Sequence, residues 1–349
     1  MISRRSLLAA GAAIPTAAFG QCVINAPAVD ACRGGVRNAG PAGQTLDLNF
    51  MFPGSLPPGI TFTRASVATY TDASGVIQTA AVNQPRWDYA GGLLRGLLIE
   101  EARTNLLLNS ATLGTQSVAV TAQAYTLSFY GAGTVTKSGA ATGALVGTGA
   151  GQRVTQTFTP TAGTLTLTVT GSVLNAQIEA AGFASSWVPT AGAAATRAQD
   201  IMTMPLAGWY SGTAGTWFAS AMMPANGNIG YRGIFDLDGG PFNVWLRAYI
   251  TGGTPNVDGN IDVTGINFGV MTPGTPFKIA ATYSAAGTHV AFNGAMGGGT
   301  AAVSTPATYT TLRLGVTDSN NANAANGYLR GVQYWPRVLS DAELQQVTT

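Results

Sequence analysis

"TLTLTVT", residues 164–170, alternates threonine with leucine or valine at every second position. Because successive side chains of a strand point to opposite faces of a sheet, Leu165, Leu167 and Val169 share one face and the threonines share the other. One apolar and one polar face are typical of a half-buried antiparallel strand. The same period recurs in AYTLSFYGAGTVTKSG (124–139) and RVTQTFTP (153–160). This part of the chain is therefore predicted to form an antiparallel β-sandwich.

The composition of the whole chain also favours an all-β protein. Charged residues make up 9% of the 349 residues, against about 25% in an average soluble protein, whereas glycine occurs 46 times. A hydrophobic content of 46% argues against disorder. The net charge is only +2 and the basic residues are scattered along the chain, so a nucleic-acid-binding surface is not expected.

Residues 1–58 are predicted to form an extended N-terminal arm, because proline and glycine recur in them and only residues 46–51 have a strand pattern. The first residues place Arg4 and Arg5 before a mildly apolar run that ends in AFG (18–20). This resembles a twin-arginine export signal; the alternative is an arm that stays on the chain and docks onto a neighbouring subunit. The run is shorter than the roughly 20 apolar residues of a membrane span, so no span is expected.

Cys22 and Cys32 are the only cysteines, and both lie in this arm. In an oxidising compartment they are able to close a small loop through a disulfide. Two free thiols are an equal alternative. No histidine or aspartate pattern accompanies them, so a zinc site is not expected.

A second β-rich block covers residues 201–349. Its strand candidates include GTWFASAMMP (215–224) and FKIAATYSAAGTHVAFNGAM (277–296), separated by turns rich in glycine and asparagine. This spacing is typical of a second sandwich. The block ends in SDAELQQV, where Ser340 and Glu343 have the spacing of a helix capping box. Glu343 is therefore assigned a structural role.

Few residues in this chain are able to support catalysis. A glycosidase needs two carboxylates about 5–10 Å apart, and glutamate occurs only at positions 100, 101, 179 and 343. Asp236 and Asp238 come nearest to a carboxylate pair, because alternate strand positions share a face. The favoured interpretation of the two aspartates is a solvated strand end or hairpin flank, and ligand binding is the alternative. The single histidine, His289, has no G-x-S-x-G nucleophile motif with it, so no catalytic residue is assigned and the protein is expected not to be an enzyme.

Trp245, Arg247 and Tyr249 are candidates for sugar binding. They lie at alternate positions and so share one face of a strand. Large aromatic side chains pack in a core by default, which is the favoured interpretation. On an outward face, the same three residues would form a platform for a sugar.

The segment NVDGNIDV is the candidate for a metal site. It brings Asp258, Asn260 and Asp262 close together in sequence. An oxygen-rich loop of this kind suits Ca²⁺, but the same residues favour tight turns, and the turn is the favoured interpretation. No other cofactor is expected.

Three motifs near the start of the β-rich region resemble a segment of phage and prophage fibre or head-spike proteins. They are FTRAS (62–66), PRWDY (85–89) and GLLIEEARTNL (96–106). The last block is similar to the concanavalin/laminin-G-like sandwich, with a K-x-A-x-x-Y strand that starts at Lys278 and an N-G hairpin at Asn293.

These likenesses imply an all-β protein of tandem antiparallel sandwiches behind an N-terminal arm. The implied division places a β-hairpin linker or collar at 59–110 and a short, jelly-roll-like module of carbohydrate-binding type at 111–200. A concanavalin/laminin-G-like domain follows at 201–349.

The resemblance implies a non-catalytic fibre or spike subunit of a virion, which displays its terminal sandwich for attachment to a host surface glycan. Its partners would be host surface polysaccharide and other virion subunits, and it would assemble as a homo-oligomer. The alternative is an exported bacterial lectin-like carbohydrate-binding protein. A third hypothesis is a polysaccharide depolymerase that uses Asp236 or Asp238.

The arginines of the motif segment are predicted to have a structural role. Their positions allow Arg64, Arg86 and Arg103 to meet Glu100, Glu101 and Asp88 once the hairpin folds onto the strand that follows. A bidentate arginine–carboxylate pair would fix the register of strands whose Thr, Ala and Val faces specify it only weakly.

Overall fold

The computed structural model describes residues 40–224, 230–238, 243–251, 254–262, 264–298, 309–317 and 323–349. The expected export segment, Cys22 and Cys32 lie outside these residues. The chain divides into Met1–Gly40 and one compact unit, Pro41–Thr349, and the elements below all belong to the second. No helix in the described part of the chain is long and apolar enough to cross a membrane.

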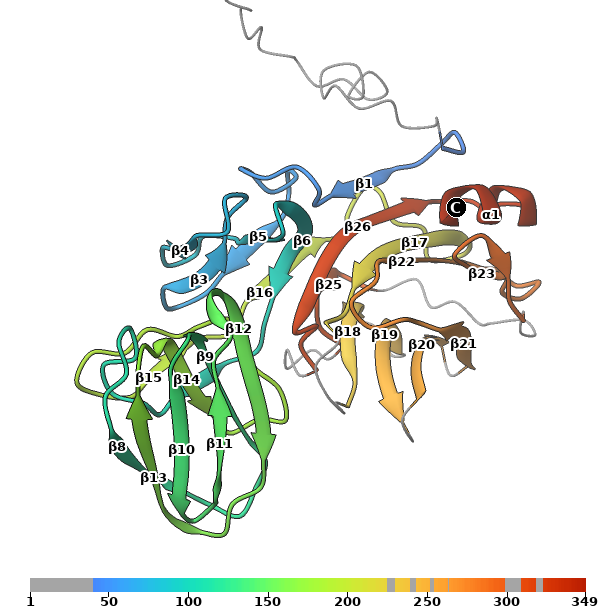
Figure 1. Cartoon of the computed structure of the whole chain (residues 1–349). Coiled ribbons are helices and arrows are strands. Elements are labelled where there is room, and N and C mark those ends of the chain that lie inside the picture. The colour runs from blue at the N-terminus through green and yellow to red at the C-terminus, as the bar shows by residue number, and fades with distance from the viewer. Residues whose placement is uncertain are drawn as a thin grey trace, which may run out of the picture. The chain divides into compact units, whose positions relative to one another are not determined.

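The fold is all-β, as the sequence predicted, and a smaller and a larger sandwich make up most of it (Figure 1). In the smaller one, the sheet β11-β10-β13-β8 packs on the sheet β12-β9-β14. The strands are β8 (Gln116–Val120), β9 (Tyr125–Gly131), β10 (Thr134–Gly139), β11 (Gly143–Val146), β12 (Gly149–Phe158), β13 (Gly163–Thr170) and β14 (Leu174–Glu179). Leu165 and Leu167 on β13 are fully buried and Val169 packs against the same core, so TLTLTVT is a half-buried strand, as predicted.

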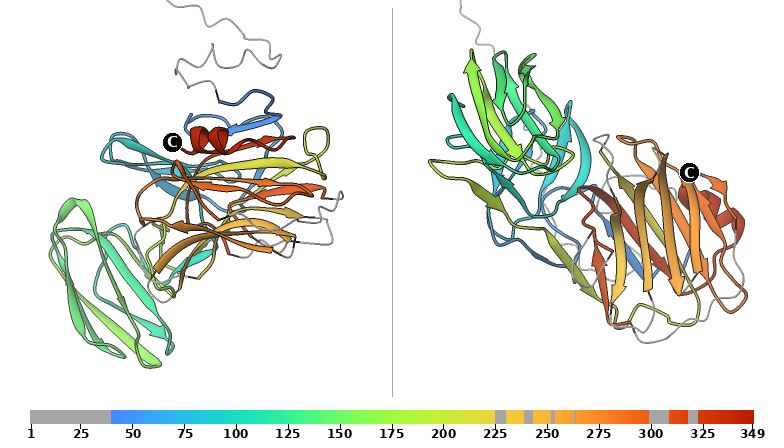
Figure 2. Two further views of the ribbon diagram at one scale, coloured as in Figure 1. Left: turned by 90° about the vertical axis from the view of Figure 1, so that its right-hand side faces the viewer. Right: turned by 90° about the horizontal axis from the view of Figure 1, so that it is seen from below.

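The larger sandwich consists of two antiparallel sheets that face each other in Figure 2. One sheet has the order β24-β23-β22-β17-β26-β6-β5, with β1 also paired to β26. Its strands are β1 (Leu46–Asn49), β5 (Trp87–Ala90), β6 (Leu93–Ile99), β17 (Gly215–Met222), β22 (Phe277–Tyr283), β23 (Val290–Phe292), β24 (Ala295–Met296) and β26 (Gly327–Trp335).

The second sheet has the order β2-β16-β25-β18-β19-β20-β21. Its strands are β2 (Thr61–Thr63), β16 (Ile201–Pro205), β18 (Arg232–Asp238), β19 (Asn243–Thr251), β20 (Thr254–Asp262), β21 (Thr264–Val270) and β25 (Thr311–Leu314). Trp217, Phe235 and Tyr334 are among the large side chains buried between the two sheets.

The sheets cross the domain bounds expected at residues 58, 110 and 200. β1 comes from the expected arm and β6 from the expected collar, yet both pair with β26 near the C-terminus. The reason is hydrophobic: Leu48, Leu97 and Ile99 are buried in the same core as the C-terminal strands. The larger sandwich is therefore completed by strands from the N-terminal third of the chain.

The smaller sandwich is inserted into the chain of the larger one. β7 (Arg103–Asn105) precedes it and β15 (Ala195–Arg197) follows it, and these two strands pair antiparallel. The side-chain amide of Asn105 donates to the carbonyl oxygens of Ala176 and Val188, at 3.0 and 2.8 Å. These bonds tie the entry to the inserted module to its exit.

A separate hairpin joins β3 (Ala68–Thr71) to β4 (Ile77–Ala80). Its turn is held by Asp72, whose Oδ1 accepts hydrogen bonds from two backbone N–H groups of the turn, both at 2.9 Å. Gly75 has a φ of 81°, a left-handed conformation that glycine adopts without strain.

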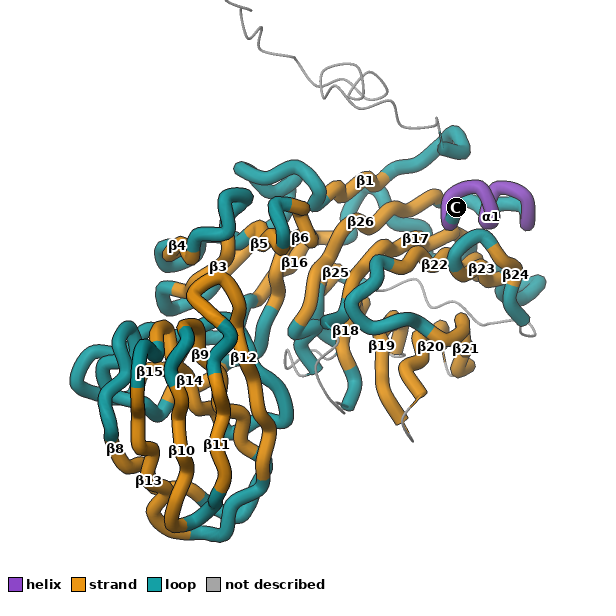
Figure 3. The backbone as a smooth tube through the Cα atoms, in the orientation of Figure 1, coloured by secondary structure: helices purple, strands orange, loops and turns teal. Residues whose placement is uncertain are grey.

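One helix, α1 (Asp341–Thr348), closes the described chain (Figure 3). The Ser340 hydroxyl accepts from the backbone N–H of Glu343, whose carboxylate accepts from the Ser340 N–H at 2.8 Å. This is the expected capping box. Leu344 is buried against Phe218 and Trp335, so the helix covers part of the outer face of the eight-stranded sheet.

Candidate functional site

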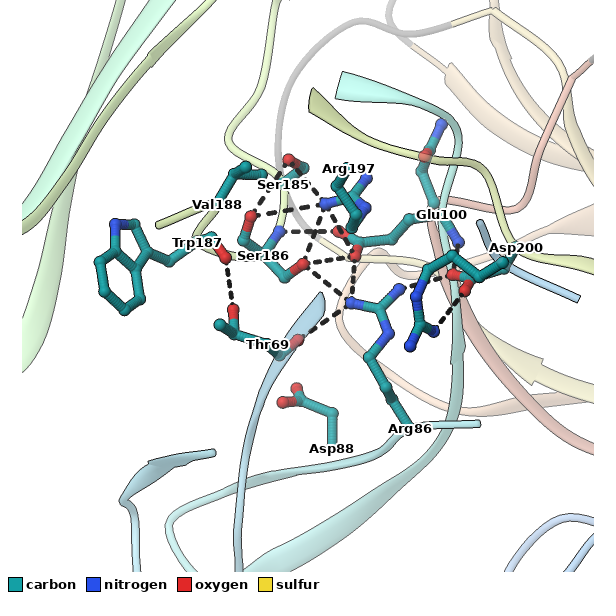
Figure 4. A network of polar contacts seen from close by, with 12 residues as sticks. Thr69, Arg86, Asp88, Glu100, Ser185, Ser186, Trp187, Val188, Arg197 and Asp200 are labelled. Carbon is teal, nitrogen blue, oxygen red and sulfur yellow. Dashed lines mark hydrogen bonds and ion pairs between the residues drawn. The ribbon is translucent and has the colours of Figure 1, made fainter. Parts of the chain in front are cut away.

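A buried network of arginines and carboxylates joins the hairpin region to the segment after the smaller sandwich (Figure 4). Arg86 is fully buried between two carboxylates: one Nη contacts Glu100 Oε2 at 2.8 Å and the other contacts Asp200 Oδ2 at 2.5 Å. Arg64 pairs with the second oxygen of Asp200 at 3.0 Å, and Arg197 pairs with Glu100 at 3.1 Å. Two carboxylates thus serve three guanidinium groups.

Neutral groups complete the network. The Ser186 backbone N–H donates to Glu100 Oε1 at 2.7 Å, and its hydroxyl donates to Oε2 at 2.6 Å. Arg86 also donates to the carbonyl oxygen of Thr69 at 2.9 Å. Burial opposes ionisation of Glu100, but Arg197, Arg86 and Ser186 outweigh it and lower the pKa of Glu100 to about 2. Glu100 is therefore charged in the folded protein.

The structure contains two of the pairings expected from sequence, Arg86 with Glu100 and Arg103 with Glu101. The partner of Arg64 is Asp200, which the sequence did not single out. The carboxylates that pair with Arg64, Arg86 and Arg103 do not include Asp88. The Asp88 carboxylate accepts from the Thr71 N–H and the Tyr328 hydroxyl. The expected set was limited to nearby carboxylates, whereas the insertion brings Asp200 next to Arg64 and Arg86.

A cleft of about 400 Å³ adjoins this network. Glu100, Ser186 and Thr69 belong to both. Its lining also contains the aromatic residues Tyr70, Tyr89, Tyr130, Phe183, Trp187 and Tyr328. Besides Glu100, the charged lining residues are Asp88, Arg95 and Arg153. The walls come from the β3–β4 hairpin, both sandwiches and the segment between them, which the network holds in place.

Asp88 lies on β5 at the wall of the cleft and is almost fully buried. Its Oδ1 accepts from the Thr71 N–H at 2.7 Å and its Oδ2 accepts from the Tyr328 hydroxyl at 2.9 Å. Burial raises the pKa of the Asp88 carboxyl, although these two hydrogen bonds oppose the shift. A carboxyl in this position suits hydrogen bonding to a hydroxyl-rich ligand.

A β-bulge places Arg95 beside Asp88. On β5 and β6, Asp88 pairs with Gly96 and Tyr89 pairs with Leu94, so Arg95 has no residue opposite it. A bulge of this kind redirects a side chain, and here the Arg95 guanidinium lies 4.4 Å from the centroid of the Tyr328 ring. Gly96 has a φ of 139°, which only glycine adopts readily.

Arg153 lines the other side of the cleft, from β12 of the smaller sandwich. The pairing of β12 with β9 is also irregular at this point, because it shifts between Gly149 and Val154. The two Nη atoms of Arg153 donate to the Ser185 carbonyl oxygen at 2.5 Å and to the Ser128 hydroxyl at 2.7 Å. Both acceptors are neutral.

The residues predicted to bind sugar lie elsewhere, on the seven-stranded sheet. Leu246 and Ala248 on β19 face the core, and Arg247 between them belongs to the opposite, outward face. Arg247 forms a bidentate ion pair with Asp258, in which Nε donates to Oδ1 at 2.9 Å and Nη2 donates to Oδ2 at 3.0 Å. Its guanidinium lies 3.5 Å from the centroid of the Tyr231 ring. The side chains of Trp245 and Tyr249 lie outside the described residues.

Asp236 and Asp238 share that outward face of β18, because the intervening Leu237 is in the core. Asp238 is the last residue of β18, at the flank of the β18–β19 hairpin, whereas Asp236 lies within the strand. Asp236 is only 6% exposed and lies opposite Arg313 on the neighbouring strand. Asp238 is half-buried and accepts from Arg313 Nη2 at 2.8 Å. Both aspartates thus lie beside Arg313 of the neighbouring strand β25.

The proposed metal segment is not a loop. It forms β20, which pairs with β19 and β21 along its length, and Asp258 is engaged by Arg247. The side chains of Asn260 and Asp262 lie outside the described residues. Within the described part of the chain, no group of three or more His, Cys, Asp and Glu residues is placed to hold a metal ion.

His289 is 58% exposed at its side chain and contacts Asp341 at 2.7 Å. Asp341 is the first residue of helix α1. The pair lies on the protein surface at the helix start.

Sequence reasoning missed Asp200, Arg197, Arg95, Arg153 and Trp187. Trp187, Arg197 and Asp200 lie in a segment interpreted as a connector, SSWVPTAGAAATRAQD (185–200). One signal was available: in a chain with 9% charged residues, an arginine and an aspartate three positions apart in an otherwise neutral connector are unusual.

Comparison with known proteins finds only weak similarity to solved structures. No family model and no curated protein matches the chain. A heptameric SAP-like pentraxin from Limulus polyphemus is similar at 11% identity and a TM-score of 0.32, over 71% of this chain and 82% of that chain. The CBM40 domain of the Ruminococcus gnavus IT-sialidase is similar at 18% identity and a TM-score of 0.32, over 40% and 84%.

Domain 4 of an extracellular arabinanase from Geobacillus stearothermophilus, solved with arabinotriose, is similar at 12% identity and a TM-score of 0.34, over 43% of this chain and 73% of that domain. Identities and TM-scores this low assign no function to this chain.

Proposed function

We propose that the protein is a non-catalytic glycan-binding protein whose binding site is the cleft beside the arginine network. The observation that carries the proposal is the lining of that cleft. It combines half-buried aromatic rings, such as Tyr70 and Tyr130, with polar groups such as Asp88. Saccharides present apolar ring faces and many hydroxyls, which aromatic faces and hydrogen-bonding side chains recognise together.

The proposal extends to the setting of this site. In this proposal the protein is a fibre or spike subunit of a virion, and it assembles as a homo-oligomer. It uses the cleft to attach to host surface polysaccharide. The support is the resemblance of the FTRAS, PRWDY and GLLIEEARTNL motifs to a segment of phage and prophage fibre or head-spike proteins. Arg64, Arg86, Asp88 and Glu100, one or two from each motif, all lie at the network or at the cleft wall.

The binding site is tested with two tyrosine variants and a matched control. Tyr70→Ala and Tyr130→Ala are expected to weaken binding to host capsule or lipopolysaccharide oligosaccharides about tenfold each, since each removes a stacking face. Tyr231→Ala removes a 46% exposed tyrosine that lies just before β18, beside Arg247, and is expected to leave binding unchanged. Titration calorimetry on the full chain measures all three.

Weaker binding by Tyr231→Ala, with unchanged binding by Tyr70→Ala and Tyr130→Ala, would place the binding site on the outer face of the seven-stranded sheet, beside Arg247. Release of new reducing ends from the same glycans would overturn the non-catalytic assignment and favour the depolymerase. Mass spectrometry of the native chain separates the two settings, because cleavage after Gly20 would favour the exported lectin-like protein over the virion subunit.

A further inference from the structure

We infer that the cleft selects an acidic saccharide, and that Arg95 and Arg153 bind its anionic group. This inference rests on the proposed glycan-binding function and specifies the chemical class of the ligand. The anionic group is a carboxylate, sulfate or phosphate carried by a sugar ring.

Both arginines line the cleft, Arg95 beside Asp88 and Arg153 beside Ser185. Among the residues that the structure describes, neither Arg95 nor Arg153 lies within ion-pair distance of a carboxylate. Arg95 has the Tyr328 ring beneath its guanidinium. Arg153 uses its two Nη atoms on neutral oxygens, and its buried Nε has no acceptor in the described part of the chain.

The remaining charges of the cleft compensate this positive charge only in part. Glu100 is engaged by Arg86 and Arg197, so it is not available to neutralise the two cleft arginines. The network itself holds three arginines and two carboxylates, and the buried carboxylate of Glu179, which attracts Arg197, balances the third arginine.

Asp88 is the remaining carboxyl of the lining. It attracts Arg95, and its oxygens also accept from Tyr328 and Thr71. With Asp88 counted as charged, the charged lining residues outside the network, Arg95, Arg153 and Asp88, carry a surplus of one positive charge. A cleft with low-dielectric walls concentrates the field of its charges. The field here is positive, and it attracts an anionic ligand.

The backbone also places these two residues at special positions. Each arginine lies at an interruption of its strand ladder: Arg95 in the bulge between β5 and β6, and Arg153 in the register shift between β12 and β9. Bulges occur near binding sites because they turn a side chain away from the regular pleat. Two independent irregularities therefore bring the two arginines to one cleft, Arg95 from the larger sandwich and Arg153 from the smaller one.

The test compares matched pairs of saccharides that differ only in charge. Oligogalacturonates are set against their carboxyl-reduced products, and sulfated galactan oligosaccharides against desulfated ones. We expect the full chain to bind the acidic member of a pair at least about tenfold more tightly, with affinity that falls as salt rises. Sodium sulfate at matched ionic strength is the competitor that distinguishes a sugar-borne group from a free anion.

Four variants locate the effect. Arg95→Gln and Arg153→Gln are each expected to lower affinity for the acidic member about tenfold and to leave affinity for the neutral member unchanged. Arg95→Lys keeps the charge and should restore part of the loss. Arg313→Gln, on the outer face of the seven-stranded sheet, is the matched control, and thermal unfolding confirms that each variant is folded.

The outcomes separate this inference from the function on which it rests. Equal binding of acidic and neutral members, with Tyr70→Ala still weakening both, would overturn the acidic selectivity and leave glycan binding standing. Competition by sulfate as strong as by the saccharide would show a free-anion site and overturn the inference as well. Binding to no member of either pair would overturn both the inference and the proposed function.

Discussion

Arg86 has its guanidinium in a place that water does not reach. Removing a charge from water costs several kcal/mol, and the fold offsets this cost with hydrogen bonds to charged and neutral acceptors. Glu100 and Asp200 supply the charged acceptors, and the Thr69 carbonyl and Ser186 hydroxyl supply the neutral ones. Such a cluster specifies the register of the strands around it, because hydrophobic packing alone does not distinguish one register of a Thr/Ala/Val strand from the next.

Asp200→Asn is expected to be strongly destabilising. The change leaves Arg64 and Arg86 with a neutral partner in a buried site, and breaking a buried ion pair costs about 3–5 kcal/mol. Guanidinium chloride unfolding of the full chain measures the loss as a lower transition midpoint. Asp341→Asn is the control, because its pair with His289 is more than half exposed and such pairs contribute about 0–1 kcal/mol. Equal losses in the two variants would contradict a structural role for the network.

At the level of elements, the chain uses short local devices to start and stop its strands and its helix. Asp72 and Gly75 close the β3–β4 turn, and Ser340 with Glu343 caps helix α1. Each device depends on residues within a few positions of one another. For this reason these elements appear at the places that the sequence pattern indicates.

Ser340→Ala is expected to lower the free energy of unfolding by about 1 kcal/mol, since it leaves a helix N–H without its acceptor. Ser340→Asn keeps a capping oxygen and should cost only a few tenths of that. Hydrogen exchange of the α1 amides gives the local readout, and faster exchange is expected in the alanine variant only. Unchanged exchange in both variants would mean that the packing of Leu344, rather than the cap, holds the helix.

At the level of the whole molecule, the main feature is the insertion of the smaller sandwich into the chain of the larger one. The two halves of the larger sandwich are separated in sequence by the smaller one, and β7 and β15 pair where the chain leaves and returns. The network lies across this junction, because Arg64, Arg86 and Glu100 precede the insertion and Arg197 and Asp200 follow it. Its charges therefore hold distant chain segments together.

Stability is expected to fall as the pH is lowered from about 5 to about 2. The pKa of Glu100 is lowered from 4.5 to about 2 on folding, so its stabilisation is complete above pH 4.5 and is lost as the folded form takes up a proton. Asp88 acts in the opposite sense, because burial raises its pKa and protonation relieves that cost. Unfolding midpoints measured across this range, for the unaltered chain and Glu100→Gln, test the assignment.

The Glu100→Gln chain should be less stable near neutral pH and should lose less on acidification. Glu343→Gln is the control: the pKa of Glu343 is also lowered to about 2, mainly by its hydrogen bond with Arg337, but the pair lies at the surface. Salt screens a surface pair and hardly affects a buried one, so only the Glu343 contribution should shrink at high salt. A Glu100→Gln chain with an unaltered acid profile would contradict the role given to Glu100.

The sequence by itself determined the features that depend on neighbouring residues. The period of two in TLTLTVT marked the strands and their buried faces, the low charge and many glycines indicated an all-β fold, and the Ser340–Glu343 spacing indicated the capped helix. These are local properties, since backbone geometry sets the direction of each side chain from its position alone.

Only the tertiary structure decided which distant segments meet. It paired β1 and β6 with β26, brought Asp200 to Arg64 and Arg86, and formed the cleft from residues of the hairpin region, both sandwiches and the segment between them. It also made the NVDGNIDV segment a strand that pairs on both sides. The physical reason is that strand partners and ion-pair partners are chosen by the burial of the whole chain, and a pattern of period two is compatible with many pairings.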